Sequence, residues 1–272
     1  SALYAANRDF GYVDSQALCE ANVADGDLTH GDLRWRVLVL PGADTLPLEA
    51  WKNVAKFWRQ GGMVIAIGTR PANSESEFPS AHVQAIAREL FGTEDAPHVV
   101  TNPVGGAGIL LPTGMIALVP EIVDALFERD AACAEARAPV RITRRYIDGH
   151  EVYFAINDSD AAWEGEMRFC DRGVDEEWDP ATGVMTPLAD GTRVPVRLGP
   201  YDAMLFRSAT ANVPERLGGT VAGALSITCE PLPETPEPTV GQGRFVQSEV
   251  TGDDASGWRA AATLLEGQVD TF

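Results

Sequence analysis

The hydrophobic pattern changes its period near residue 138, and this change constrains the fold more than any other feature of the sequence. Before it, short apolar runs alternate with stretches whose apolar residues recur every three or four positions, as in buried strands and amphipathic helices. The runs cover residues 35–42, 63–68 and 108–111, and the helical stretches cover residues 47–60, 80–92 and 120–137. After it, apolar and polar residues alternate. The sequence therefore predicts an α/β region followed by an all-β region.

The first region, residues 1–137, is predicted to be a flavodoxin-like or amidotransferase-like α/β domain. Strands that alternate with helices require right-handed crossovers, so they form a parallel sheet with flanking helices. Ligands of such sheets gather at the carboxyl ends of the strands. Here those ends fall at residues 41–42, 68–71 and 105–106.

The second region, residues 138–210, is predicted to be a small antiparallel β-sandwich or barrel. Its alternating apolar positions lie at residues 140–142, 152–156, 167–169, 194–198 and 203–205. The pairs Asp148-Gly149 and Asp190-Gly191 are typical of the tight turns in hairpins. Several short strands separated by such turns favour a sandwich.

The last portion, residues 211–272, is predicted to be a linker and the start of a further, jelly-roll-like β domain. Residues 230–238 are rich in proline and glutamate, which favours an extended spacer. Residues 243–250 are strand-like, and an apolar stretch at 258–265 lies close to the end of the sequence. Because the sequence also begins with serine, we expect it to be a piece of a longer protein.

Charge and composition limit the partners. The 272 residues include 40 acidic and 21 basic ones, which gives a net charge of −19. Such a surface repels phosphate backbones and anionic lipids, so neither nucleic acid nor a membrane is an expected partner. The four cysteines and four histidines do not cluster at metal-ligand spacing, and no nucleotide-binding glycine motif is present, so we predict no metal and no cofactor. An uncharged ligand such as a sugar is compatible with this charge.

The turn after the apolar run at 63–68 is the first candidate for chemistry. In amidotransferase-like proteins, the nucleophilic cysteine stands at this elbow, beside a histidine and backbone amides that stabilise an oxyanion. Here Gly68 occupies that position and is followed by Thr69 and Arg70. Glycine has no side chain that could attack a substrate, and Thr69 would need a base. We interpret the three residues as a vestigial elbow turn and predict no catalytic residue in the chain.

Two tryptophans and one acidic cluster are candidates for contact with carbohydrate. Trp163 and Trp178 could stack on a sugar ring, although tryptophans at this spacing also serve as core residues. Four carboxylates could include a pair for glycoside hydrolysis, but a solvated loop also explains them: Asp175, Glu176, Glu177 and Asp179.

Several stretches together resemble a known family. They are FGYVDSQAL at residues 10–18 with WRVLVLPG at 35–42, GGMVIAIG at 61–68, and RRYIDGHEVYFAIN at 144–157 with EWDPATG and LGPY behind it. Their order is similar to that of the region after the catalytic domain of large bacterial glycoside hydrolases, above all the α-L-rhamnosidases of glycoside hydrolase family 106. More distantly, it resembles the amidotransferase-like trimerisation domain of family 42 β-galactosidases.

The resemblance implies a C-terminal accessory region, in which an amidotransferase-like domain and a β-sandwich follow a (β/α)8-type catalytic domain. That upstream domain would hold the catalytic carboxylates and would be this chain's main partner, and the resemblance allows a homo-oligomer. The parent enzyme would hydrolyse plant or microbial polysaccharide, in the periplasm or outside a bacterial cell. Two alternatives stay open: a carbohydrate-binding module that uses Trp163 or Trp178, and a stand-alone amidotransferase-like hydrolase that uses Thr69.

Overall fold

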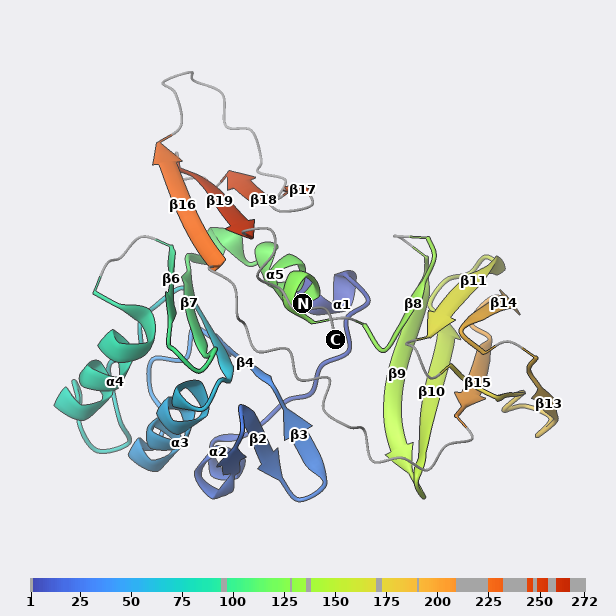
Figure 1. Cartoon of the computed structure of the whole chain (residues 1–272), viewed down its shortest axis with the longest axis horizontal. Helices are drawn as coiled ribbons and strands as arrows, with labels where there is room; N and C mark the ends of the chain where they lie inside the picture. The colour runs from blue at the N-terminus through green and yellow to red at the C-terminus, as the bar shows by residue number, and fades with distance from the viewer. Residues whose placement is uncertain are drawn as a thin grey trace. The chain divides into compact units, whose positions relative to one another are not determined.

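The computed structural model describes residues 2–93, 97–127, 129–135, 138–169, 173–189 and 191–208, and four further strands between residues 225 and 264. The chain divides into two compact units, shown in Figure 1. One comprises Ser1–Gly11 and Phe127–Leu217, and the other comprises Tyr12–Leu126 and Gly218–Phe272. The described strands form five sheets, of which four are antiparallel and one contains parallel strands. A mixed α/β architecture with an antiparallel β region, as predicted, is therefore present.

The α/β unit is built on a four-stranded sheet in the order β4-β5-β7-β6. Strands β4 (Val37–Pro41), β5 (Met63–Ile67) and β7 (Ala107–Leu111) are parallel, as the sequence predicts. Strand β6 (His98–Thr101) pairs with β7 in the antiparallel direction and was not predicted. The sheet is therefore mixed, not purely parallel. The carboxyl strand end predicted at residues 105–106 is wrong, because these residues precede β7, which ends at Leu111.

Helices α3 (Leu48–Arg59) and α4 (Ala81–Phe91) lie beside this sheet and beside each other in Figure 1. The apolar stripe of each helix is buried, as the spacing of its residues predicts. The fully buried members of the two stripes are Ala50, Trp51, Val54, Phe57, Val83, Ala87, Leu90 and Phe91. All five residues of β5 are buried as well, so both faces of this strand are covered, as expected for a central parallel strand.

A glycine on β7 allows α4 to approach the sheet closely. A Cβ atom at Gly108 would lie 1.9 Å from the carbonyl oxygen of Leu90, near the end of α4. No side chain fits in this space, so the glycine sets the distance between helix and sheet.

The predicted helix at residues 120–137 is wrong in its extent. Helix α5 spans Leu118–Leu126, and Ala131–Cys133 form strand β8 of the sandwich, which pairs with β11 (Trp163–Phe169). The alanines around residue 131 have a high helix propensity, but pairing with β11 supplies backbone hydrogen bonds that override it. The division of the chain also assigns residues 127–137 to the sandwich unit, whereas the sequence analysis groups them with the α/β region.

A small sheet precedes β4 and was not predicted. After helix α2 (Ser15–Glu20), strands β1 (Asn22–Ala24), β2 (Asp27–His30) and β3 (Leu33–Trp35) form an antiparallel meander. Asp14 caps α2 by accepting a hydrogen bond from the Ala17 amide at 2.7 Å.

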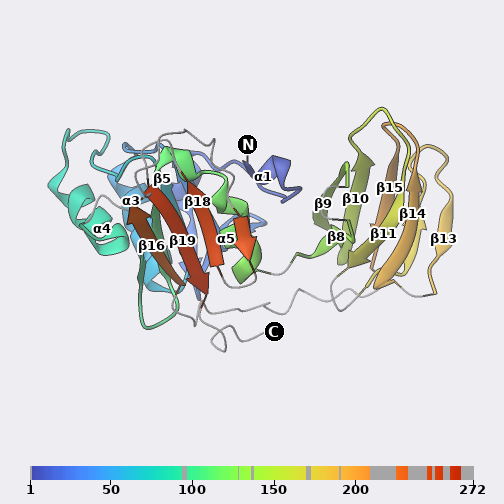
Figure 2. The same cartoon turned by 90° about the horizontal axis from the view of Figure 1, so that it is seen from above.

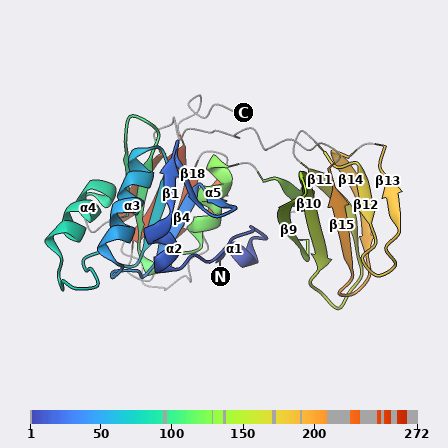
Figure 3. The same ribbon diagram turned by 90° about the horizontal axis from the view of Figure 1, so that it is seen from below.

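The sandwich unit pairs a five-stranded sheet, β13-β12-β15-β10-β9, with a three-stranded sheet, β14-β11-β8. Figure 2 shows the strands of the two sheets facing each other, and Figure 3 shows β13 at an outer edge. The remaining strands are β9 (Val140–Ile147), β10 (His150–Asn157), β12 (Glu176–Trp178), β13 (Met185–Pro187), β14 (Arg193–Leu198) and β15 (Ala203–Arg207). The predicted alternation is observed in β9, β11 and β14, whose apolar residues point into the core. In β10 and β15 the predicted face is wrong: Tyr153, Ala155 and Phe206 are buried, and the predicted apolar residues lie on the opposite face, namely Val152, Phe154, Ile156, Ala203 and Leu205. Tyr153, Phe169 and Phe206 meet in the core, with ring centroids 5.1 Å apart in each of two pairs.

The N-terminal segment belongs to the sandwich, although more than a hundred residues separate it from the first sandwich strand. Helix α1 (Ala2–Ala5) is tied to the edge strand β9 by Arg141, whose guanidinium lies 3.9 Å from the ring centroid of Tyr4. The Arg141 Nε donates to Asp158 Oδ2 at 3.1 Å, and the Tyr4 hydroxyl donates to the same oxygen at 2.8 Å. Arg141 also donates to the carbonyl oxygen of Tyr4 and to Asn7 Oδ1.

The two points where the chain leaves and re-enters this unit lie close together. Arg8 Nη2 donates to the carbonyl oxygen of Phe127 at 3.1 Å, and Arg129 Nη1 donates to that of Asn7 at 3.5 Å. Residues on either side of the α/β segment are therefore hydrogen-bonded to each other within the sandwich unit.

The last described strands form one antiparallel sheet, in the order β16-β19-β18-β17. They are β16 (Leu225–Pro231), β17 (Arg244–Val246), β18 (Glu249–Asp253) and β19 (Trp258–Leu264). The strand-like residues 243–250 and the apolar stretch 258–265 are thus largely in strands. Most of the predicted spacer at 230–238 lies outside the described residues.

Candidate functional site

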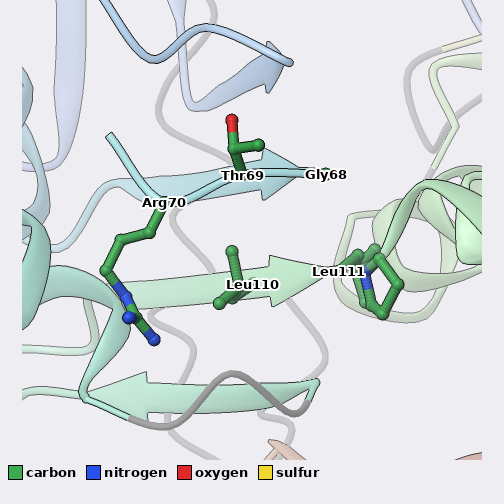
Figure 4. A pocket seen from close by; sticks show the side chains of 6 residues that line it. Gly68, Thr69, Arg70, Leu110 and Leu111 are labelled. Atoms are coloured by element: carbon green, nitrogen blue, oxygen red, sulfur yellow. The ribbon is translucent and has the colours of Figure 1, made fainter. Parts of the chain in front are cut away.

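The vestigial elbow turn lines a hollow at the carboxyl end of the parallel strands. The hollow has a volume of about 330 Å³, and Gly68, Thr69 and Arg70 line it together with residues 110–112. Figure 4 shows that the side chains of Thr69 and Arg70 point in opposite directions from the turn. This is the place where the sequence analysis expects a ligand of a parallel sheet.

Position 68 favours glycine for two reasons. Its φ angle is +89°, a conformation that side-chain-bearing residues rarely adopt. A Cβ atom there would also lie 2.9 Å from the Thr113 hydroxyl oxygen. A nucleophilic side chain at this position would therefore require the turn to change.

The lining of the hollow offers little chemistry. Among the described residues that line it, none is a histidine, a cysteine or a carboxylate, and Thr69 supplies the only hydroxyl. His98 lies on β6 opposite Leu110 in the strand register, but it is not among the lining residues. A hydroxyl without a neighbouring base is a weak nucleophile at neutral pH. Among the described residues that line the hollow, none is a base that could activate Thr69.

The two candidate sugar-stacking tryptophans occupy different environments. Trp163 is 6% exposed and packs in the core between the sheets, where its Nε1 donates to Glu135 Oε2 at 3.3 Å. Its ring therefore does not present a face to solvent. Trp178 is half-buried on the outer face of the five-stranded sheet.

Trp178 is held by two charged neighbours. Its Nε1 donates to Glu176 Oε2 at 3.1 Å, and the Arg207 guanidinium lies 5.4 Å from its ring centroid. Arg207 Nε is also 3.3 Å from Glu176 Oε2, so the three side chains contact one another. Glu176 and Arg207 are directly opposite in the register of β12 and β15.

Two carboxylates of the acidic cluster have structural contacts. Glu176 is bound to Arg207, and Asp179 instead closes the turn that follows β12. Hydrogen bonds from the Thr182 hydroxyl and the Ala181 amide hold the pKa of the Asp179 carboxyl below its usual value. Among the described residues, no group of histidine, cysteine, aspartate and glutamate side chains could hold a metal ion. In the described part of the chain, no helix is long and apolar enough to cross a membrane.

The strand register reveals a surface that the sequence analysis missed. Five residues from five strands stand side by side on the outer face of the sheet, and we call them the cross-strand row: Met185, Trp178, Leu205, Phe154 and Thr143. Met185 is 59% and Phe154 is 36% exposed. One signal in the sequence separates the two tryptophans, because residues an even number of positions apart in a strand point to the same face. Trp163 lies on the same face as the apolar Met167 and Phe169, whereas Trp178 lies on the same face as Glu176, which points outward.

Comparisons with known proteins give a fold match only. No model of a protein family matches the chain, and no curated protein matches it. Among solved structures, a rhamnosidase from Novosphingobium sp. PP1Y aligns with 84% of this chain at 21% identity and a TM-score of 0.54. The match covers 23% of the rhamnosidase, so this chain spans about a quarter of its length.

Two β-galactosidases match less well. Gan42B, a GH42 β-galactosidase from G. stearothermophilus, aligns with 76% of this chain and 35% of its own at 10% identity, with a TM-score of 0.46. A β-galactosidase from Rahnella sp. R3 gives the same coverage and identity with a TM-score of 0.47. The chain thus shares its fold with a part of the rhamnosidase.

Proposed function

We propose that this chain is a non-catalytic accessory part of a larger glycoside hydrolase related to the α-L-rhamnosidases of family 106. Its two units would correspond to the amidotransferase-like domain and the β-sandwich behind the catalytic domain. The observation that carries the proposal is the match of 84% of this chain to 23% of a rhamnosidase. An accessory region of a larger enzyme is expected to align over most of its own length but over only a small share of the whole enzyme.

The geometry of the elbow turn supports the same function. Among the described residues that line its hollow, none is a base and Thr69 is the one hydroxyl nucleophile. Gly68 is in a conformation that disfavours a side chain. In this proposal, a separate (β/α)8-type domain of the same protein carries the catalytic carboxylates. The parent enzyme then cleaves glycosidic bonds of plant or microbial polysaccharide.

The test is hydrolysis of 4-nitrophenyl α-L-rhamnopyranoside and 4-nitrophenyl β-D-galactopyranoside. We expect the 272-residue chain to release no nitrophenol above the protein-free rate, and the Thr69→Ala variant to behave identically. The protein encoded by the complete gene should hydrolyse the rhamnoside. Turnover by the chain alone that disappears in Thr69→Ala would instead establish a stand-alone hydrolase. A complete gene that encodes nothing beyond this chain would also overturn the proposal.

A further inference from the structure

The outer face of the five-stranded sheet carries an exposed aromatic and apolar surface. In the cross-strand row, Trp178 and Phe154 are each directly opposite Leu205, so all three side chains project from the same face. Neighbouring strands lie about 4.8 Å apart, so the two aromatic residues are separated by about 10 Å across the sheet. The row ends in the exposed Met185 on one side and in the hydroxyl of Thr143 on the other.

The charges on this face are balanced, in contrast to the rest of the molecule. Arg207 pairs with Glu176 at 3.3 Å, Arg141 with Asp158 at 3.1 Å, and Arg145 with Asp9 at 3.6 Å. These three arginines of the described outer face therefore each have a carboxylate partner, although the chain as a whole carries a charge of −19. A locally neutral surface on such an acidic protein suits an uncharged ligand and offers nothing to a polyanion.

We propose that this face binds a neutral glycan chain that runs across the strands. The exposed parts of Trp178 and Phe154 would stack against the apolar faces of sugar rings, since aromatic rings offer a large, flat contact surface. Their separation across one intervening strand is comparable with the length of a disaccharide unit, so alternate sugars could meet the two rings. This inference goes beyond the proposed function, because it gives the accessory part a binding activity of its own.

The charged pair beside Trp178 provides the polar contacts that a sugar needs. Sugar hydroxyls both donate and accept hydrogen bonds, and Glu176 and Arg207 offer an acceptor and donors next to the ring. The same two residues hold the indole from its Nε1 and from above its ring plane. A ring that is already fixed loses little conformational entropy when a ligand stacks on it.

Affinity electrophoresis tests the proposal directly. The chain is run in native gels that contain xyloglucan, galactomannan or arabinoxylan, which are neutral, or polygalacturonate, which is anionic. We expect at least one neutral polysaccharide to retard the wild-type chain and polygalacturonate not to retard it. The Trp178→Ala and Phe154→Ala variants should each bind the retarding polysaccharide about tenfold more weakly.

The matched control is Tyr146→Ala. Tyr146 is an exposed aromatic residue (48%) on β9, but it faces away from the cross-strand row, opposite the buried Glu151. This variant should be retarded as strongly as the wild type. Far-UV circular dichroism and thermal melting of each variant identify any loss of fold. The two row variants lie on different strands, so one of them that stays folded is sufficient to test whether the row binds the polysaccharide.

Three results would overturn the proposal. The first is that no neutral polysaccharide retards the wild-type chain, and the second is that both folded row variants are retarded like the wild type. The third is a dimer, measured by light scattering, that Trp178→Ala dissociates without any effect of glycans, because the face is then a protein interface. None of these depends on hydrolysis of nitrophenyl glycosides, so the accessory function can fail or hold independently.

Discussion

Replacing Gly108 by alanine should destabilise the α/β unit, because the sheet and α4 approach each other too closely for a side chain. The new Cβ would lie 1.9 Å from the carbonyl oxygen of Leu90, whereas an ordinary contact begins at 3.4 Å. The helix must therefore move by about 1.5 Å. Leu90 and Phe91 are fully buried, so this shift opens gaps around them.

The expected magnitude follows from these contacts. Overpacking a core costs about 1–3 kcal/mol, and a backbone oxygen cannot rotate away, so we take about 3 kcal/mol. Alanine also lowers the entropy of the unfolded chain, which returns about 0.4–1 kcal/mol. The net loss of unfolding free energy is about 2–3 kcal/mol, which corresponds to a roughly 30- to 150-fold change in the equilibrium.

Hydrogen–deuterium exchange with mass spectrometry resolves the two units separately. In Gly108→Ala, peptides from β5 and β7 should exchange faster by this factor, while peptides from β10 and β11 should be unchanged. Gly199→Ala is the control, since its Cβ meets nothing closer than 3.7 Å. Unchanged exchange in β5 and β7 of Gly108→Ala would refute the close-approach argument.

Two further predictions concern the sandwich unit. Arg141→Ala removes the contacts that hold Tyr4 and Asp158, so residues 2–9 should become protease-sensitive and the unit should lose about 1–3 kcal/mol; protection equal to the wild type would contradict this. Burial, followed by the charge of Glu135, raises the pKa of the Cys133 thiol from 9.0 to about 11, so its reaction with Ellman's reagent at pH 8 should be about a hundredfold slower than in the unfolded chain. Because the folded state holds this proton more tightly, the contribution to stability is complete below pH 9 and should be lost as pH rises toward 11. The chain has four cysteines, so the rate is measured in a variant that keeps Cys133 alone, and rapid labelling of that folded variant would disprove the prediction.

The local hydrophobic pattern was sufficient to predict many of the strands and helices of the α/β unit. Strand β5 consists of five apolar residues followed by a glycine, and α3 has an uninterrupted apolar stripe, so both elements were predictable from hydrophobicity and spacing. Strand β6 has only four residues, and it exists because β7 supplies its hydrogen bonds. The same holds for β8, whose alanine-rich sequence does not favour a strand.

The candidate binding surface could not be predicted from the sequence, because register creates it. Trp178 and Phe154 are far apart in the chain, and both are paired with Leu205 only in the folded sheet. The burial of Trp163 was open to prediction: Met167 and Phe169 share its parity in β11, and all three are buried. The elbow turn was located from its sequence, but the backbone conformation that favours glycine at position 68 required the structure.

The bonds between Arg8 and Phe127 and between Arg129 and Asn7 have a consequence for the evolution of this architecture. They bring together the two ends of an interruption of more than a hundred residues, so Tyr12–Leu126 has the topology of an insertion into the sandwich unit. Insertions of this kind are tolerated where the two chain ends at the insertion point of the host domain are adjacent, because the host domain then keeps its own structure. An insertion of residues 12–126 at this point of a sandwich gene would therefore join adjacent ends, and a short bridge in place of these residues should leave the sandwich unit able to fold.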